Sequence, residues 1–325
     1  MNAFFPPFDV TAGLRRPLTS DEARWLTCAA HMAAEGKKAA RPLAGMAAGR
    51  VALGRGAGGD HTLEIDRACE TAIRRVLERE APASYLLVSE ETGVGGSQDA
   101  PWRVVVDPLD GSLNAKRGLE PYCASIAIAQ GETLGDVSIA YVEDYTRPRC
   151  FAAVQGVGLV CPGTAPGVCT EKAQESVSAV VSSGYRAEPA GVVGGLVEVV
   201  LLEAGRPDRY HFGYHDLSTI GAVGRSQDMR VRQIGSLALA LCYVAIAVAD
   251  ILLAAVPARS VDIAAGLRIL SEAGGGAAAL TDQDIWAQPL DLEKRSAFVA
   301  WRAGLDQVEV VSRARELSKN LLVVT

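Results

Sequence analysis

The segment Asp107–Ser112, with the sequence DPLDGS, constrains this chain more than any other stretch. It follows the apolar run at 103–106, so the pattern predicts a strand that ends in a tight turn. Such a turn can direct both of its carboxylates and the Leu109 carbonyl at one point, and hard divalent cations such as Mg²⁺ prefer oxygen ligands in that arrangement. Gly111 permits a backbone conformation that is closed to other residues. With Ser112 it would open a helix whose free amides suit a phosphate group.

The same segment has a simpler interpretation, because Asp, Pro and Gly are the commonest turn formers. Taken alone, it is better explained as an ordinary turn. Four further acidic residues change this balance, because they too stand near the ends of predicted strands or the starts of predicted helices. They are Asp66, Glu90, Glu91 and Asp262. Each has its own simple explanation, such as a helix cap for Asp262 or a surface ion pair for Asp66, and only their combination points to a metal site.

Composition limits the partners of this chain. Its 325 residues could form one large domain or two of ordinary size, and a hydrophobic share of 49% is ample for a core. The formal net charge of −6 argues against a nucleic-acid-binding surface, which needs a basic patch. An acidic balance is instead compatible with a protein that gathers carboxylates around cations.

The cysteines indicate a reducing compartment. The chain has seven, an odd number, and none forms a C-x-x-C pair, so neither a disulfide framework nor a zinc site is expected. Cys28, Cys69, Cys123 and Cys242 stand in apolar or helical surroundings and are interpreted as small buried residues. Residues 1–10 lack the pattern of a signal peptide. We therefore expect a cytoplasmic protein.

One long apolar stretch raises the question of a membrane span. Leu237–Val256 is nearly all apolar and long enough to cross a bilayer. Asp250 lies inside this stretch, however, and would be costly in lipid. Gly235-Ser236 is typical of a helix start, whereas the Ile-Leu-Leu run at 251–253 suits a strand. We predict a buried helix followed by a buried strand, and no contact with a membrane.

The remaining pattern predicts a change of architecture along the chain. In the first half, a capping box at Thr19–Glu22 opens a helix, a second helix covers 63–80, and strands follow at 85–88, 123–129, 137–142 and 150–154. In the second half we expect strands at 179–183, 230–234 and 298–299, and helices at 193–202, from Ser236, at 261–273 and at 306–319. The first half is thus α+β and the second α/β. The Gly- and Pro-rich stretch at 156–167 suggests two domains, 1–170 and 171–325.

Several of these pieces together resemble the superfamily of magnesium-dependent, lithium-sensitive phosphatases that contains inositol monophosphatases and fructose-1,6-bisphosphatases. The matching pieces are Ser89-Glu90-Glu91, the turn Asp107–Ser112, Val261–Gly266 with Glu272–Gly275 after it, and Gly235-Ser236 before an Ala-rich helix. The chain is most similar to the archaeal-type branch, whose members often act on both inositol phosphate and fructose bisphosphate. The stretches at 56–66, 114–126 and 259–262 carry this closer likeness.

The resemblance implies a layered αβαβα sandwich with a site between its two halves. By position in the motifs, a first Mg²⁺ would be bound by Glu90, Asp107 and the Leu109 carbonyl, and a second by Asp107, Asp110 and Asp262. A third, weaker Mg²⁺ site would use Glu90. The implied catalytic residues are Asp66 and Ser112, which would orient or deprotonate the attacking water, and Glu91, which would hold Glu90. The implied substrate contacts are Gly111, Ser112, Gly235, Ser236 and Arg259.

The activity that the resemblance implies is Mg²⁺-dependent hydrolysis of a small sugar or polyol phosphate monoester, with inositol-1-phosphate and fructose-1,6-bisphosphate as leading substrates. Animal-type inositol monophosphatases carry a Glu shortly before the last metal Asp, where this chain has the acid-free run Ala254–Pro257. Arg186, Arg225, Arg232 and Arg259 are candidates for binding a second phosphate. Histidinol phosphate, 3′-phosphoadenosine 5′-phosphate and a catalytically weak phosphometabolite-binding regulator are the alternatives. A homodimer and inhibition by lithium are further expectations from the family.

Overall fold

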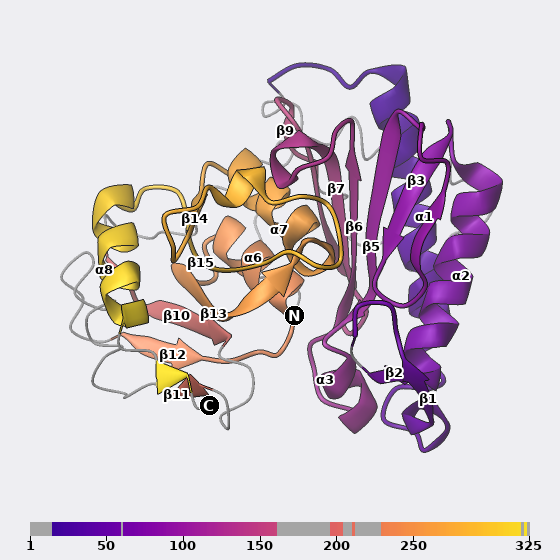
Figure 1. Cartoon of the computed structure of the whole chain (residues 1–325), viewed down its shortest axis with the longest axis horizontal. Coiled ribbons are helices and arrows are strands. Elements are labelled where there is room, and N and C mark those ends of the chain that lie inside the picture. The colour runs from indigo at the N-terminus through magenta and orange to yellow at the C-terminus, as the bar shows by residue number, and fades with distance from the viewer. Residues whose placement is uncertain are drawn as a thin grey trace, which may run out of the picture.

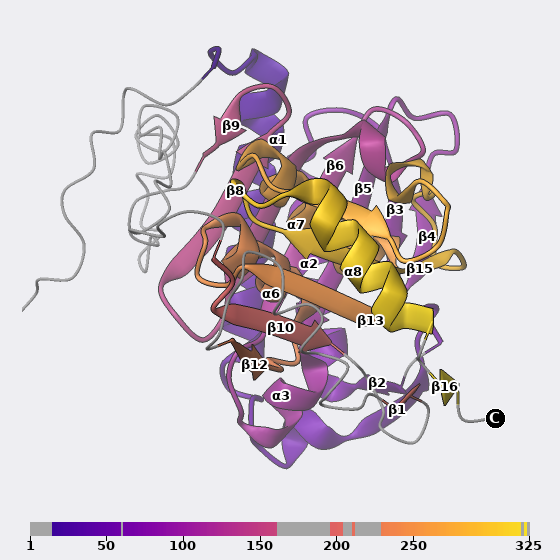
Figure 2. The same ribbon diagram turned by 90° about the vertical axis from the view of Figure 1, so that its left-hand side faces the viewer.

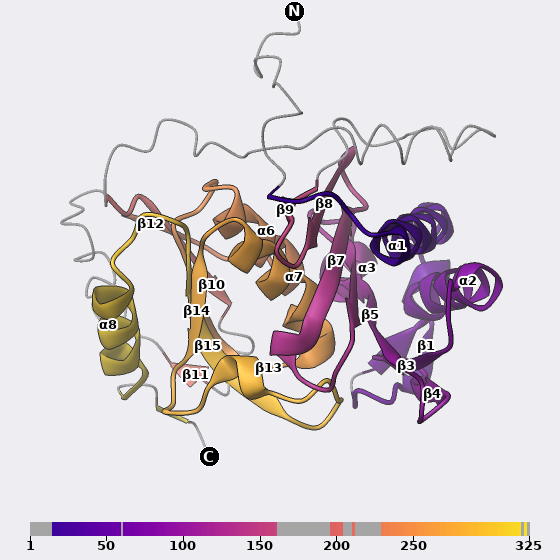
Figure 3. The same cartoon turned by 90° about the horizontal axis from the view of Figure 1, so that it is seen from above.

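The computed structural model describes residues 15–59, 61–160, 196–203, 210–211, 229–319 and 322–323. The predicted strand at 179–183 and the predicted domain boundary near residue 170 lie outside these residues, as do Arg186 and Arg225. Within them, helices and sheets alternate in five layers (Figures 1 and 3).

Two helices, α1 (Ser20–Ala40) and α2 (Glu64–Glu80), cover the outer face of a seven-stranded sheet (Figure 1). The strands are β3 (Tyr85–Ser89), β4 (Gly93–Gly96), β5 (Trp102–Asp110), β6 (Cys123–Ala129), β7 (Val137–Asp144), β8 (Arg149–Val154) and β9 (Gly158–Leu159). Their order is β4-β3-β5-β6-β7-β8-β9, and β3 and β5 run parallel. The first two helices pack on this sheet through a continuous buried core that includes Trp25, Ile65 and Ile126.

The middle layer consists of α6 (Leu237–Ala245) and α7 (Ser260–Glu272), which lie between this sheet and a five-stranded one. The second sheet has the order β12-β10-β13-β15-β14. Its strands are β10 (Val199–Glu203), β12 (Arg230–Arg232), β13 (Ile251–Arg259), β14 (Gly276–Ala279) and β15 (Arg295–Trp301). Helix α8 (Gln307–Lys319) lies across the far face of this sheet (Figure 2). The predicted layered αβαβα sandwich is confirmed.

Shorter elements connect these layers. The helical ones are α3 (Ser112–Arg117) and the 3₁₀ turns η1 (Ala48–Arg50), η2 (Leu134–Asp136) and η4 (Ile285–Ala287). Two small two-stranded sheets pair β1 (Ala52–Arg55) with β2 (His61–Leu63), and β11 (Tyr210–His211) with β16 (Leu322–Val323).

Local signals account for where the first helix begins and ends. The Thr19 hydroxyl accepts from the Glu22 amide, and the Glu22 carboxylate accepts from the Thr19 amide at 2.7 Å, so the predicted capping box is present. The helix ends at Ala40. Arg41 still has right-handed helical geometry and its amide donates to the Lys37 carbonyl oxygen at 3.1 Å, but Pro42 has no amide hydrogen with which to continue the pattern.

The apolar stretch from Leu237 is a buried helix followed by a buried strand, as predicted. Asp250 stands between the two elements and is satisfied inside the protein. Its Oδ1 accepts from Arg302 Nε at 2.5 Å, and its Oδ2 accepts from the amides of Glu198 and Val199. None of the helices in the described ranges is long and apolar enough to span a membrane.

The predicted helix over 193–202 is wrong, because Val199–Glu203 is strand β10. This strand lies between β12 and β13 and pairs in parallel with both. A run of Val and Leu residues without helix-capping signals suits such an interior position, where tertiary pairing decides between strand and helix. The cysteines that the structure describes are buried and form no disulfide with one another, namely Cys28, Cys69, Cys123, Cys150 and Cys242.

Candidate active site

The DPLDGS segment forms the end of β5 and the start of α3. The pairing of β5 with β6 is irregular between Asp107 and Asp110, so the two acidic residues leave the regular alternation of the strand. The Asp107 side chain accepts from the Leu109 amide at 2.9 Å, which fixes the turn. Gly111 has a φ of 88°, and a Cβ there would lie 3.1 Å from the Gly235 carbonyl oxygen. The turn therefore requires glycine at this position.

Three of the predicted metal ligands come together. One carboxylate oxygen from each of Glu90, Asp107 and Asp262 lies within 4.8 Å of the others. Glu90 follows β3 and Asp107 belongs to β5, and these parallel neighbours end at the same edge of the sheet. Asp262 lies in the first turn of α7, which follows β13 of the second sheet. The cluster thus joins the two halves of the molecule.

Burial and mutual repulsion make these carboxylates reluctant to carry charge. Asp107 is 3% exposed, and burial together with the charges of Glu90, Asp110 and Asp262 raises its pKa well above the usual value. Burial raises the pKa of Glu90 to about 8, although the neighbouring Arg259 opposes the shift. Such a crowded all-oxygen set fits a hard divalent cation, whose charge would relieve the repulsion.

Arg259, predicted as a substrate contact, lies against this cluster. Its Nη2 donates to Glu90 Oε1 at 2.5 Å and to Asp262 Oδ1 at 3.0 Å, and its Nε donates to Asp262 Oδ2 at 3.2 Å. The remaining terminal nitrogen donates to the carbonyl oxygen of Gly58 at 3.0 Å. A role in substrate binding stays a prediction, since these contacts are all to the protein itself.

Asp110 is held apart from the other three by the N-terminus of α6. Its Oδ2 accepts from the Ser236 hydroxyl at 2.6 Å and from the Ala238 amide at 2.7 Å. Burial raises the pKa of Asp110 to about 6, while these hydrogen bonds oppose the rise. Its charge is still close enough to raise the pKa of Asp107. Ser236, a predicted substrate contact, is fully buried and uses its hydroxyl to hold this carboxylate.

Asp66 has the features of a general base. It is 2% exposed in the first turn of α2, where its Oδ2 accepts from the Leu63 amide at 2.7 Å. Its other oxygen, Oδ1, is buried and has no hydrogen-bond partner among the residues that the structure describes. Burial raises the pKa of Asp66 to about 7, and the charge of Glu91 adds to the shift. A carboxylate that titrates near neutral pH is well matched to proton transfer.

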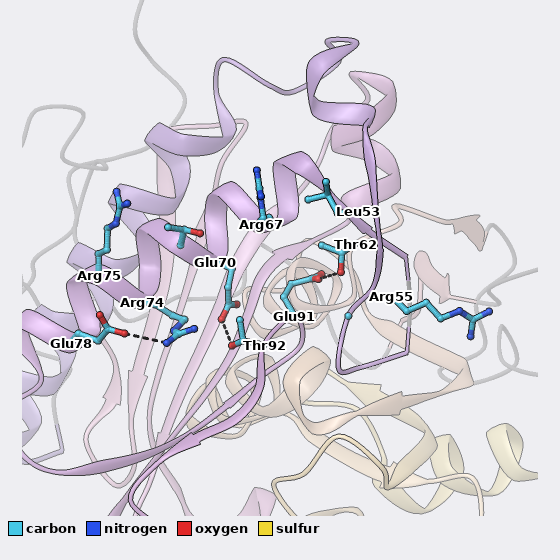
Figure 4. A pocket seen from close by; sticks show the side chains of 12 residues that line it. Leu53, Arg55, Thr62, Arg67, Glu70, Arg74, Arg75, Glu78, Glu91 and Thr92 are labelled. Carbon is cyan, nitrogen blue, oxygen red and sulfur yellow. Dashed lines mark hydrogen bonds and ion pairs between the residues drawn. The ribbon is translucent and has the colours of Figure 1, made fainter.

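Glu70 holds the loop that carries Glu90 and Glu91, and sequence reasoning missed it. The Glu70 carboxylate accepts from the Thr92 hydroxyl at 2.7 Å (Figure 4). It also accepts from the Ser89 hydroxyl, so it holds the loop on both sides. The signal was present, because Glu70 follows Asp66 by one helical turn and so lies on the same face of α2.

A pocket of about 450 Å³ lies between α2 and the loop after β3 (Figure 4). Glu91 lines it and accepts from the Thr62 hydroxyl, which ties the loop to β2. None of the three clustered carboxylates is part of its lining. Figure 4 also shows that the Arg74 side chain points to Glu78 within the wall, an exposed pair typical of a helix surface.

Two of the predicted substrate contacts, Gly111 and Gly235, lie close together. Gly235, with a φ of 74°, approaches Gly111 closely, and a Cβ there would lie 3.0 Å from Asn114 Nδ2. Asn114 donates to the carbonyl oxygens of Pro121 and Ile234, so it joins α3 to the segment before α6. Ser112 is half-buried at the first position of α3. The fold therefore brings Gly111 and Gly235 together, and a role of these residues and of Ser112 in binding a phosphate stays a prediction.

A layered αβαβα fold whose two halves contribute carboxylates to one cluster defines a class of phosphoric monoester hydrolases that depend on divalent cations. The chain belongs to the inositol monophosphatase family, because the model of that family matches residues 22–318. Members of this family are in general Mg²⁺-dependent.

Similarity to individual proteins supports this family assignment. A fructose-1,6-bisphosphatase/inositol-1-monophosphatase of Methanothermobacter thermautotrophicus is 30% identical over 79% of this chain and 84% of its own length. The Nus factor SuhB of Xylella fastidiosa is 29% identical over 66% of this chain and 68% of its own length. A crystal structure described as an inositol monophosphatase-fructose 1,6-bisphosphatase has a TM-score of 0.68 at 20% identity, covering 92% of this chain and 100% of that one. The last likeness supports the fold.

Proposed function

We propose that this protein hydrolyses a small sugar or polyol phosphate monoester with Mg²⁺, and that inositol-1-phosphate and fructose-1,6-bisphosphate are its leading substrates. The observation that carries the proposal is the buried cluster of Glu90, Asp107 and Asp262. Asp66 supports it, because a carboxyl group with a pKa near 7 suits the handling of an attacking water, and its buried Oδ1 has no hydrogen-bond partner among the described residues.

Each residue has a distinct task in this proposal. Glu90, Asp107, Asp262, Asp110 and the Leu109 carbonyl would hold the Mg²⁺ ions, two or three in number. When bound, the ions neutralise charge on the phosphoryl group and on the leaving oxygen. The chain itself then orients the reactants, with Asp66 and Ser112 on the attacking water and the amides of Gly111 and Ser112 on phosphate oxygens.

The evidence for the identity of the substrate is weaker than the evidence for the type of reaction. The Methanothermobacter relative carries both activities in its name, which supports a dual preference. Ala254–Pro257 supplies no acid for inositol hydroxyls, whereas Arg232 is an exposed cation that suits a second phosphate. We also propose two domains, 1–170 and 171–325, and a homodimer.

Phosphate release from a panel of esters tests the proposal. The panel contains inositol-1-phosphate, fructose-1,6-bisphosphate, histidinol phosphate and 3′-phosphoadenosine 5′-phosphate, each with and without millimolar Mg²⁺. Mg²⁺-dependent release from either of the first two supports the full proposal. Release from the last two alone would replace the substrate but keep the metal site. No release from any ester by folded, Mg²⁺-binding protein would favour a phosphometabolite-binding regulator.

Removing the Glu70 carboxylate should weaken Mg²⁺ binding although Glu70 is not a proposed ligand. Glu70→Ala frees both Ser89 and Thr92, so the loop that carries Glu90 loses its anchor. Loss of such a supporting contact costs about 10- to 100-fold in metal affinity. Titration calorimetry with Mg²⁺ measures the effect. Glu78→Ala, on the exposed side of the same helix, is the matched control, and equal affinities in both variants would refute the anchoring role.

A further inference from the structure

The guanidinium of Arg259 occupies an interior position that surface arginines do not share. Its side chain is 7% exposed, and it forms ion pairs with both Glu90 and Asp262. The first of these carboxylates follows β3 of the seven-stranded sheet, and the second begins α7 after the other sheet. One cation thus bridges the two halves of the proposed metal site.

The surrounding backbone is built around this guanidinium. The Arg259 amide donates to Asp262 Oδ2 at 2.8 Å, so the same carboxylate holds both the backbone and the side chain of the arginine. On the opposite side, a Cβ at Gly58 would lie only 2.3 Å from Arg259 Nη1. Residue 58 must therefore be small for the guanidinium to reach its place.

We propose that Arg259 is a positioning residue that acts as an internal counter-cation: it holds Glu90 against Asp262 and competes with Mg²⁺ for their oxygens. The inference rests on the proposed function, since it concerns the metal site assigned there. When ionised, the three carboxylates carry three negative charges, and the guanidinium cancels one of them. Because an arginine stays protonated at all relevant pH values, this charge is permanent.

Two consequences follow from the position of this charge. A fixed cation in contact with two ligands repels an arriving Mg²⁺, so it keeps the affinity for the ion low. It also keeps the Glu90 and Asp262 carboxylates in a fixed relative position, which favours the correct geometry when Mg²⁺ is bound. Removing the charge should therefore tighten Mg²⁺ binding but slow the reaction. A residue that only stabilised the fold would weaken both.

The experiment combines Mg²⁺ titration calorimetry with thermal unfolding and steady-state kinetics of the whole chain. For Arg259→Gln we expect Mg²⁺ to bind about tenfold or more tightly than to the wild type, because a like charge in contact has been removed. We expect the unfolding temperature to fall in EDTA and to recover at saturating Mg²⁺, since the ion then replaces the lost positive charge. We also expect kcat to fall.

Arg295→Gln is the matched control, because Arg295 donates to the same Gly58 carbonyl oxygen at 3.1 Å. Within the described ranges, Arg295 forms no ion pair with a carboxylate. This control should leave Mg²⁺ affinity unchanged. Arg259→Lys keeps one positive charge without the planar fork, so Mg²⁺ should bind it with an affinity between those of the wild type and Arg259→Gln.

Several results would overturn the inference alone. In the first, the wild type binds Mg²⁺ and Arg259→Gln binds it with equal or lower affinity. In the second, the substitution lowers the unfolding temperature equally with and without Mg²⁺. If Arg259→Gln does not fold in either condition, weaker binding by Arg259→Lys than by the wild type decides against the proposal. A wild type that binds no Mg²⁺ would instead remove the proposed metal site, and the inference with it.

Discussion

Replacing Asp107 with asparagine is expected to lower Mg²⁺-dependent phosphate release by about a thousandfold or more. Stabilisation of transition-state charge by a bound metal is worth several kcal/mol, and each 1.36 kcal/mol corresponds to about tenfold in rate. Asp107 lies at the centre of the carboxylate cluster and is the ligand proposed to be shared between two ions. Its loss should therefore affect the whole metal site.

The same substitution should leave the protein folded. The pKa of Asp107 lies well above its usual value because the buried charge is unfavourable, so a neutral amide removes a source of repulsion. The asparagine oxygen can still accept from the Leu109 amide. Circular dichroism and thermal unfolding in EDTA should match or exceed the wild type. Asp306→Asn, at the exposed start of α8, is the control with the same chemical change.

Unchanged phosphate release by Asp107→Asn would rule out the metal assignment. A loss of activity that accompanies unfolding would say nothing about catalysis, and the thermal scan separates these two results. Titration with Mg²⁺ adds a direct measure, because the variant should bind the ion far more weakly than the Asp306→Asn control.

Replacing Asp66 with asparagine is expected to lower kcat by about 10²- to 10⁴-fold, which is the usual contribution of a general base. The pKa of Asp66 is raised to about 7, so the wild-type rate should increase with pH through neutrality as this carboxylate loses its proton. The variant cannot titrate at this position. The residual kcat of the variant should therefore not increase with pH through neutrality, which a pH profile of kcat from 5.5 to 8.5 would reveal.

Asp66→Asn should also change stability, in the direction opposite to activity. In the unfolded chain an Asp titrates near pH 4, whereas in the folded protein the pKa of Asp66 is about 7. The folded state thus binds more protons between these values, and wild-type stability falls as the pH rises through this window. The neutral variant avoids that loss. Its advantage should be near zero at pH 4 and reach on the order of a few kcal/mol above pH 7.

Urea unfolding at pH 5 and pH 8 measures this difference. A gain in the free energy of unfolding that is larger at pH 8 supports a buried, strained carboxylate at position 66. An advantage independent of pH would point to packing instead. If Asp66→Asn kept both the full kcat and the increase of kcat with pH through neutrality, Asp66 would be excluded as the proton acceptor.

Local chemistry explains which parts of the fold the sequence made predictable. Capping at Thr19 and the turn at Asp107 are short-range signals, and the elements they delimit were predicted within a few residues. Strand β10 was predicted as a helix because its environment is set by β12 and β13, which are distant in sequence. Pairing across such distances leaves little trace in a local apolar run.

The same distinction holds for the candidate site. The carboxylates could be proposed because motif order placed them at strand and helix ends, and Glu90, Asp107 and Asp262 do meet. The contacts of Arg259 could not be predicted, since they depend on which oxygen a long side chain reaches across the packed layers. For Glu70, the helical spacing from Asp66 indicated the face of α2 but not the partners Ser89 and Thr92. Side-chain direction in three dimensions decided these two positions.

The bridge between Arg259 and Gly58 spans 201 positions of the chain. During synthesis the early acidic residues therefore emerge long before their partners on α7, and the proposed Mg²⁺ site cannot be complete until the second half has docked. An ion that binds only the folded protein shifts the folding equilibrium toward the folded state. The Mg²⁺ concentration around the nascent chain should thus influence the yield of native protein, and contacts of such high sequence separation imply slow maturation.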